Sequence, residues 1–337
     1  MIPPREARRL LMDWFQSARR DLPWRRTRDP WRILLSEVML QQTRVSVVIP
    51  YYERFLERYP TPQDLAAAPE SEYLAMWSGL GYYARARNLQ RAAKAIVERD
   101  RFPASYEEIA TLPGVGDYTA AAVASIAFGA PHAVLDGNVI RVLARFTAEA
   151  RDVQVQSVRV RLKEEAQQLL DPSKPGDFNQ ALMELGATVC LPKNPQCLLC
   201  PWRELCQARA LGREGELPIK GRKREPVKLL LTLLVAERES GGNRQVLLRQ
   251  RGAHETRLQG FWELPEERDL PHAVRGERLG EFKHSITRHD YTIEVFQATL
   301  SRAGRGHRWV NRDELDALPL ATTARKALAL QSATHTP

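Results

Sequence analysis

The sequence lacks long hydrophobic runs, and it has neither the composition nor the repeats of a fibrous or disordered chain. Its longest apolar stretch, residues 229–236 with Thr232 inside it, is far shorter than the roughly 18 residues that cross a bilayer. Glycine and proline number only 19 and 22 among 337 residues and follow no period, and 43% of the residues are hydrophobic and 27% charged. These values predict a folded protein without membrane spans, and the length predicts two domains.

Acidic residues are fewer than basic ones, which leaves the chain positively charged. Lys and Arg number 50 against 41 Asp and Glu, a formal net charge of +9. A polyanion is therefore a natural partner, although charge alone does not select DNA. The first residues, Met1-Ile2-Pro3-Pro4, begin no apolar segment before a small-residue cleavage site, so we expect a cytoplasmic chain.

The chain divides by pattern into a helical and a β-rich part. Residues 5 to about 210 have the apolar spacing of successive helices, and 212–226 are polar, charged and broken by Gly and Pro, which is typical of a linker. Strand patterns at about 227–236, 245–249 and 291–300 follow, with helices at about 312–318 and 322–330. The helices predicted in the first part are 31–40, 63–76, 85–100, 119–128, 139–148, 157–170 and 179–190.

All four cysteines lie between Cys190 and Cys206, with the spacing C-x6-C-x2-C-x5-C completed by Cys197 and Cys200. Disulfides are not expected in a reducing compartment. Four thiolates on one loop can bind either a tetrahedral zinc ion or a [4Fe–4S] cluster, and spacing alone slightly favours zinc. Four unliganded cysteines are the alternative.

Two glycine-containing connections precede helices. Residues 112–116, Leu-Pro-Gly-Val-Gly, come directly before an alanine-rich helix, and residues 78–87 repeat the glycine spacing with aromatic and basic residues. Glycines allow close approach of a phosphate, and a helix start offers free N–H groups, so the first connection can grip DNA backbone without reading bases. Each is equally consistent with an ordinary tight helix connection.

Two carboxylates are candidates for catalysis. Glu37 shares a helix face with Ile33 and Leu34, and burial there would raise its pKa into the range of a general acid. Asp136 follows an apolar run and precedes a helix start at Gly137. A pair of carboxylates can cleave a glycosidic bond, one as acid and one as stabiliser of the sugar cation. A buried structural glutamate and a simple helix cap are the alternatives.

Together these motifs resemble the helix-hairpin-helix base-excision DNA glycosylases, and specifically the MutY-type adenine DNA glycosylases. The resemblance covers about residues 8–210. Its motifs are Leu-Pro-Trp-Arg at 22–25, Ser-Glu-Val-Met-Leu-Gln-Gln-Thr at 36–43, the glycine connection at 79–89, the hairpin at 112–116, Leu-Asp-Gly-Asn-Val at 135–139 and the four-cysteine loop.

The resemblance implies roles for these residues. Glu37 is the implied acid and Asp136 the cation stabiliser, oriented by Tyr118 and Asn138, and the cysteines bind a [4Fe–4S] cluster. Tyr118 stands where relatives that also cleave the DNA backbone carry a nucleophilic lysine, so a monofunctional enzyme is expected. The implied DNA contacts are Arg25, Gln42, Thr43, Leu80, Tyr82, Gly114, Gly116, Thr287 and Arg288. The implied adenine pocket consists of Trp24, Arg25 and Glu184.

The C-terminal part resembles the Nudix-like domain of the same family. Gly-Phe-Trp-Glu-Leu-Pro at 260–265 echoes the sheet entry of Nudix hydrolases, but the acidic box that would bind metal is missing after it. Where the family often reads 8-oxoguanine with Phe-Ser-His, this chain has Ile286-Thr287-Arg288 followed by His289. Asp117 also departs from the family, in which many members have a basic residue at this position.

The resemblance thus predicts an all-α glycosylase domain with an iron–sulfur loop over 1–211, a linker over 212–226 and an α+β Nudix-like recognition domain over 227–337. The expected function is hydrolysis of adenine mispaired with 8-oxoguanine or guanine in duplex DNA, by a monomeric, nucleoid-associated enzyme without a membrane partner. A catalytically silent DNA-binding protein and a Nudix hydrolase are the alternatives.

Overall fold

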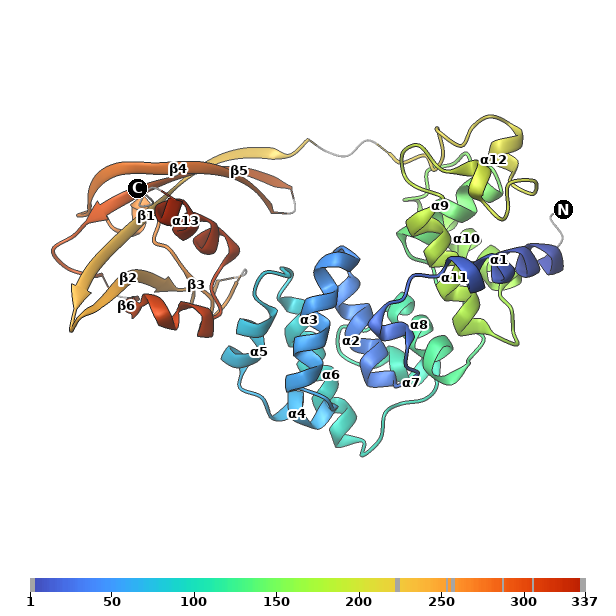
Figure 1. The fold of residues 1–337 in the computed structure, drawn as a ribbon, viewed down its shortest axis with the longest axis horizontal. Coiled ribbons are helices and arrows are strands. Elements are labelled where there is room, and N and C mark those ends of the chain that lie inside the picture. Colours follow the sequence, from blue (N-terminus) through green and yellow to red (C-terminus); the bar gives the residue numbers. More distant parts are fainter. Residues whose placement is uncertain are drawn as a thin grey trace. The chain divides into compact units, whose positions relative to one another are not determined.

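The computed structural model describes residues 4–221, 225–252, 254–255, 258–286, 288–304 and 306–333. Its contacts divide the chain into two units (Figure 1). One unit comprises residues 1–66 and 88–222, and the other comprises 67–87 and 223–337. Within the described ranges, we find no helix that combines the length and the apolar character needed to span a membrane.

The first unit is helical, as predicted. Its helices are α1 (Pro4–Ala18), α2 (Pro30–Leu40), α3 (Val45–Arg58), α4 (Pro62–Ala67), most of α6 (Ala84–Glu98), α7 (Tyr106–Ala110), α8 (Asp117–Phe128), α9 (Gly137–Phe146), α10 (Gln156–Leu169), α11 (Pro175–Thr188) and the short α12 (Gln207–Ala210).

Helix α2 forms the buried centre of this unit. The Asp29 side chain accepts a hydrogen bond from the Arg32 backbone N–H at 3.0 Å, and Pro30 occupies the first turn, where its missing N–H costs nothing. Every residue from Ile33 to Met39 is buried, which is unusual for a helix that includes a glutamate. The alanine-rich helix α8 is buried over Thr119–Ile126, so small side chains allow close packing around α2.

The predicted helix at 63–76 is wrong in one respect, because it consists of two helices. Helix α4 ends at Ala67 and α5 (Glu70–Trp77) begins after Pro69, which has extended backbone angles. Proline lacks the N–H of a helical hydrogen bond and disfavours helical angles in the preceding residue, so the chain breaks there.

The second unit contains a six-stranded mixed sheet. The strands are β1 (Val227–Ser240), β2 (Asn243–Gln250), β3 (Trp262–Glu263), β4 (Val274–Ile286), β5 (His289–Thr299) and β6 (His307–Asn311). Their order is β3-β2-β1-β5-β4, with β6 paired to β2. Strand β1 runs parallel to β5, with Leu231 opposite Ile293, and antiparallel to β2.

Helix α13 (Thr322–Ala333) packs on one face of this sheet. Ala324, Ala327 and Leu328 join a core with Val246, Val295 and their neighbours. The α+β prediction for this part is confirmed. Sequence patterns missed β4, in which polar and glycine residues interrupt the alternation, and residues 312–317 form a 3₁₀ helix rather than an α-helix.

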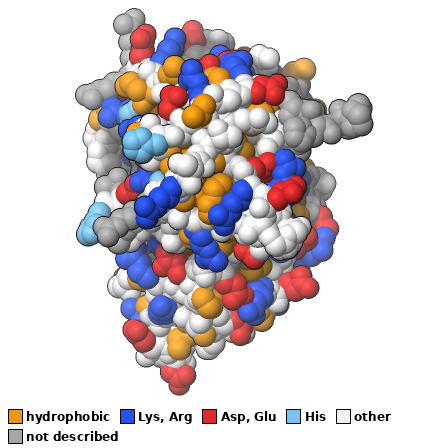
Figure 2. All heavy atoms as spheres, turned by 90° about the vertical axis from the view of Figure 1, so that its left-hand side faces the viewer, with side chains coloured by type: hydrophobic (Ala, Val, Ile, Leu, Met, Phe, Trp, Pro, Cys, Tyr) orange, Lys and Arg blue, Asp and Glu red, His pale blue; other side chains and the backbone are white. Residues whose placement is uncertain are grey.

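The positive charge is not gathered on the face drawn in Figure 2, where Lys and Arg lie interspersed with Asp and Glu. Many basic side chains are paired, as Arg244 is with Glu237 at 2.7 Å. On this face, therefore, charge does not mark a binding surface.

Candidate active site

Glu37 is a buried carboxyl group on the central helix α2. Among the described residues it forms no ion pair; its Oε2 instead accepts a hydrogen bond from the Tyr118 hydroxyl at 2.6 Å. Burial raises the pKa of Glu37 to about 7, against the opposing effect of the Tyr118 hydrogen bond, and the nearby Asp136 charge raises it further. A carboxyl group in this setting can deliver a proton near neutral pH.

Tyr118 lies in the first turn of α8, directly after the hairpin. Its hydroxyl donates to Glu37 and not to Asp136, so the expectation that Tyr118 orients Asp136 is not met. The pKa of Tyr118 is well above its usual value because of burial and the adjacent carboxylates. The tyrosine therefore stays a neutral hydrogen-bond donor, and it holds the Glu37 carboxyl in one orientation.

Asp136 caps helix α9, and both of its carboxylate oxygens accept hydrogen bonds. Its Oδ1 accepts from the Val139 N–H at 2.7 Å, and its Oδ2 accepts from the Asn138 side chain at 3.0 Å. Burial raises the pKa of Asp136, while these two hydrogen bonds act in the opposite direction. The cap and the candidate stabiliser are thus one residue, because capping fixes the carboxylate that the chemistry would use.

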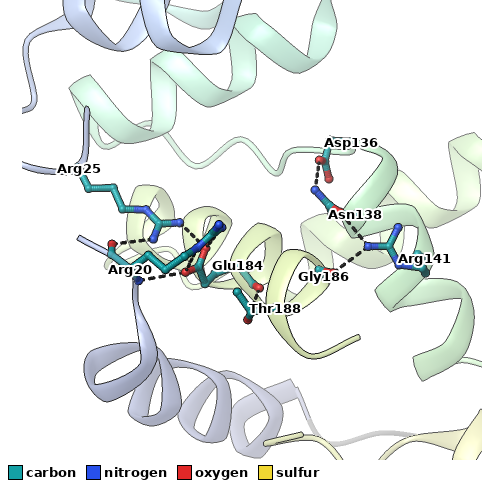
Figure 3. Close-up of polar contacts among 8 residues, drawn as sticks. All are labelled: Arg20, Arg25, Asp136, Asn138, Arg141, Glu184, Gly186 and Thr188. Carbon is teal, nitrogen blue, oxygen red and sulfur yellow. Dashed lines mark hydrogen bonds and ion pairs between the residues drawn. The ribbon is translucent and has the colours of Figure 1, made fainter. Parts of the chain in front are cut away.

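An arginine that the sequence analysis missed connects Asp136 to the cysteine loop. Arg141 donates to the Asn138 side chain at 2.8 Å and to the Gly186 carbonyl at 2.8 Å (Figure 3). It also donates to the Cys190 carbonyl at 2.7 Å. A Cβ atom at Gly186 would lie 2.6 Å from the Asn138 Cβ, so only glycine allows α11 to approach α9 this closely. Arg141 is a positioning residue, which acts on Asp136 through Asn138.

Glu184, also on α11, is the centre of a second network (Figure 3). Arg20 donates to both of its carboxylate oxygens, at 2.8 and 2.7 Å, and Arg25 donates to Oε2 at 2.8 Å. Although burial alone would raise it, the pKa of Glu184 is lowered to about 2 by these arginines. The sequence analysis did not predict Arg20 as a member of this network.

Trp24, the other predicted pocket residue, is buried and packs edge-to-face on Tyr52 at 5.4 Å between ring centres.

The predicted hairpin connects α7 to α8. Gly114 has φ +76°, and a Cβ there would lie 2.4 Å from the Asn88 Cβ, so the turn requires glycine. A Cβ at Gly116 would meet nothing within 4 Å. The backbone at the start of α8 is therefore open, which suits a phosphate at the first N–H groups of the helix.

The other predicted DNA contacts differ in exposure. Gln42 is exposed at φ +57°, directly after α2, and Thr43 is half-buried beside it. In the second unit, Tyr82 is 50% exposed at φ +48°, with the Arg85 guanidinium over its ring, whereas Leu80 is buried. The Gln42 and Tyr82 side chains are thus exposed and the Leu80 side chain is not, and all three DNA contacts stay predictions.

The predicted lesion-reading segment lies where β4 meets β5. Ile286 pairs with His289, and the Arg288 carbonyl accepts from the Val227 N–H at 2.8 Å while the Arg288 side chain is exposed. Thr287 lies outside the described residues. The Arg288 backbone is thus hydrogen-bonded to β1, and its side chain is exposed to solvent.

The four cysteines line one hollow together with Arg145 and Trp202. Arg145 is buried and, within the described part of the chain, has no carboxylate partner; it donates to the Cys190 Sγ at 3.3 Å and to the Leu191 and Leu217 carbonyls. A buried guanidinium without a carboxylate suits an anionic centre made of thiolates.

The sequence does contain a signal for two of the arginines that were not predicted, Arg141 and Arg145. Arg141 and Arg145 stand four residues apart in the otherwise largely apolar helix α9, on which Arg145 is buried. Cations on a buried helix face need specific acceptors, and here the acceptors are the loop carbonyls and a thiol. Arg20 carries no such signal, because it belongs to the charged run Arg19-Arg20-Asp21 that follows helix α1.

Two family models match the chain. One, described as HhH-GPD superfamily base excision DNA repair protein, matches residues 35–168, and one described as NUDIX domain matches 235–330. Both matches agree with the helical and sheet-containing parts of the structure.

Curated relatives match over longer stretches. The mouse adenine DNA glycosylase is 36% identical over 95% of this chain and 76% of its own length. The rat adenine DNA glycosylase is 49% identical over 62% of this chain, and the match spans only 43% of the rat protein.

Solved structures match the helical part. A thermostable thymine-DNA glycosylase has a TM-score of 0.57 and 32% identity, covering 62% of this chain and 97% of its own. An Endonuclease III in a non-covalent complex with DNA has a TM-score of 0.53 and 27% identity, covering 63% and 99% respectively.

Proposed function

The chain belongs to the adenine DNA glycosylases of the HhH-GPD superfamily of base excision DNA repair proteins, and we propose that it hydrolyses the N-glycosidic bond of adenine mispaired with 8-oxoguanine or guanine in duplex DNA. The observation that carries the proposal is the burial of the Glu37 carboxyl group and its raised pKa. Glu37 is a buried carboxyl group that forms no ion pair among the described residues, with a pKa of about 7 even against the lowering effect of the Arg25 charge, next to a second carboxylate at Asp136.

The two carboxyl groups fit the two requirements of this reaction. Adenine has to leave the base stack to be reached, and it departs as a neutral base only if a proton is supplied at N7. Glu37 supplies that proton from its buried position, and Asp136 stabilises or transiently bonds the cationic C1′ of the sugar. Glu37, then ionised, accepts a proton from the attacking water, so the carboxyl group ends the cycle as it began.

A single assay tests the proposed function. Purified protein is incubated with duplexes that carry one adenine opposite 8-oxoguanine, guanine or thymine, and alkali then breaks the strand at any abasic site. We expect breaks at the first two and little at the paired thymine. No break at either mispair would contradict the enzymatic proposal and favour a silent DNA-binding protein.

The proposed reaction is monofunctional, because position 118 is a tyrosine held by Glu37 and not an amine. We expect little covalent adduct when the parent protein and an abasic product are treated with borohydride. Tyr118→Lys should form abundant adduct, since it places an amine beside the reacting sugar. Abundant trapping by the parent would show that another amine acts as nucleophile.

We also propose that Cys190, Cys197, Cys200 and Cys206 hold a [4Fe–4S] cluster. When bound, the cluster supplies four metal–thiolate bonds that fix the loop to the end of α11, and its negative charge is met by Arg145. We expect brown protein with four irons per chain when it is made anaerobically with ample iron. One zinc per chain under those conditions would contradict the assignment.

Recognition of 8-oxoguanine is proposed for the β4–β5 junction, in which Arg288 is exposed and anchored through its backbone. Arg288→Ala should cost about 1 to 3 kcal/mol of transition-state stabilisation on the duplex with 8-oxoguanine, which lowers the excision rate there. The excision rate opposite guanine should stay nearly unchanged. The exposed Arg302, changed to Ala, is the control for a lost charge. Equal losses on both mispairs would indicate a phosphate contact instead.

The acidic groups near β3 that the structure describes are paired with arginines and do not favour the Nudix-hydrolase alternative. Glu263 is paired with Arg249 at 2.7 Å, and Glu255 is paired with Arg251 at 2.9 Å. Carboxylates neutralised by arginines are poor ligands for the divalent cations that pyrophosphate hydrolysis requires. The second unit is therefore proposed to bind and not to catalyse.

A further inference from the structure

Asp117 places a negative charge directly beside the hairpin. It is the first residue of α8, immediately after Gly116, and its side chain is 61% exposed. A helix start attracts anions through its free N–H groups and dipole, and the open backbone at the start of α8 suits a DNA phosphate. A fixed carboxylate at this position would repel that phosphate.

The carboxylate is held by groups from two other elements. Its Oδ1 accepts from the Tyr106 hydroxyl at 2.6 Å, and its Oδ2 accepts from the Lys163 ammonium on α10 at 2.9 Å. The Tyr106 ring in turn stacks on His132, with ring centres 4.4 Å apart. Against the effect of burial, these partners lower the pKa of Asp117, so the group is ionised wherever the enzyme works.

Pairing with Asp117 keeps the Lys163 ammonium from contacting a DNA phosphate. The Lys163 side chain is 28% exposed, and its hydrogen bond and ion pair are both with Asp117. A lysine beside a phosphate-binding hairpin would ordinarily add one phosphate contact to the DNA interface. Here its charge is neutralised before DNA arrives.

We propose that the Asp117–Lys163 ion pair limits the hold of the hairpin on the DNA backbone, by adding a repelling charge and by occupying a lysine that would otherwise pair with a phosphate. The inference rests on the proposed function, because it needs the hairpin to bind duplex DNA. Phosphate contacts carry no sequence information, so the effect applies to every duplex. A weaker general hold shortens the time spent on undamaged sites.

The test measures binding of a fluorescently labelled undamaged duplex by anisotropy between 50 and 200 mM salt. Asp117→Asn removes the charge and keeps a single acceptor oxygen, which can still accept from the Tyr106 hydroxyl while its NH2 group releases Lys163. We expect about three- to tenfold tighter binding at 50 mM salt and a salt dependence steeper by about one ion, as one more phosphate contact predicts. The double variant Asp117→Asn, Lys163→Met should lose most of that gain.

Tyr106→Phe is the matched structural control. It breaks the hydroxyl bond to Asp117 without changing charge, and we expect parental affinity from it. Parental binding by Asp117→Asn, or a gain that persists in full without Lys163, would overturn the inference and leave the proposed function intact. Failure of the parent to bind any duplex would overturn both.

Discussion

Replacing Glu37 with Gln is expected to lower the single-turnover rate of adenine excision by about 10²- to 10⁴-fold, the usual contribution of a positioned general acid. Gln is nearly isosteric with Glu, and its side-chain oxygen can still accept the Tyr118 hydroxyl that lies 2.6 Å from the carboxylate. The variant therefore removes the acidic proton that Glu37 would donate to adenine and changes little else in the site. Binding of the mispaired duplex should be retained, as measured by anisotropy with the same DNA.

The pH dependence of the parent provides a second readout of the same group. Glu37 has to carry its proton at the moment of bond cleavage, and its pKa is about 7. The single-turnover rate should therefore fall with rising pH above about 7, by up to tenfold per unit. The residual rate of Glu37→Gln should not show this decline.

Stability separates loss of chemistry from loss of fold. The folded pKa of Glu37, about 7, lies above the ordinary 4.5, so between these values the unfolded chain releases a proton that the folded chain keeps. The Glu37 contribution to the unfolding free energy accordingly falls as pH rises from about 4.5 to about 7. Glu37→Gln should be at least as stable as the parent at pH 8.

Glu149 offers a matched control, because it is also a buried glutamate. Its carboxylate is paired with Arg151 at 2.7 Å and Arg161 at 3.3 Å. Glu149→Gln should lower stability modestly, since it removes the buried charge with which the half-exposed Arg151 and Arg161 pair, and should leave the excision rate near parental. A near-parental rate for Glu37→Gln would remove Glu37 from the role of acid.

The sequence predicted the fold well where pattern and breakers are local. Asp29 and Pro30 marked the start of α2, and the apolar residues around Glu37 indicated its burial. The failures have equally local causes, such as Pro69 splitting a predicted helix and the irregular alternation of β4.

The site was predictable in its members but not in its connections. That Glu37 and Asp136, 99 positions apart, influence each other depends on the packing of the helical unit. The Tyr118 hydrogen bond to Glu37 and the Arg141 link to Cys190 join elements distant in the chain. No periodicity or cap encodes such pairings, so only the structure could supply them.

Replacing Asp136 with Asn tests the second carboxylate while its helix cap is retained. Asn is as good a helix cap as Asp, so the hydrogen bond from the Val139 N–H, 2.7 Å in the parent, can persist. What disappears is the negative charge that stabilises the sugar cation, together with the acceptor for the Asn138 amide at 3.0 Å, and we expect a single-turnover loss of about 10²- to 10³-fold.

Asp29 is the matched control for this variant, because it caps α2 in the same way, accepting from the Arg32 N–H at 3.0 Å. Asp29→Asn changes the same atoms at the same kind of position outside the proposed chemistry, and its rate should be parental. If Asp136→Asn also cut at a near-parental rate, the carboxylate would be a cap and nothing more. If only Asp136→Asn lost activity while mispair binding and melting temperature stayed parental, the loss would belong to the charge, because the cap is common to both variants.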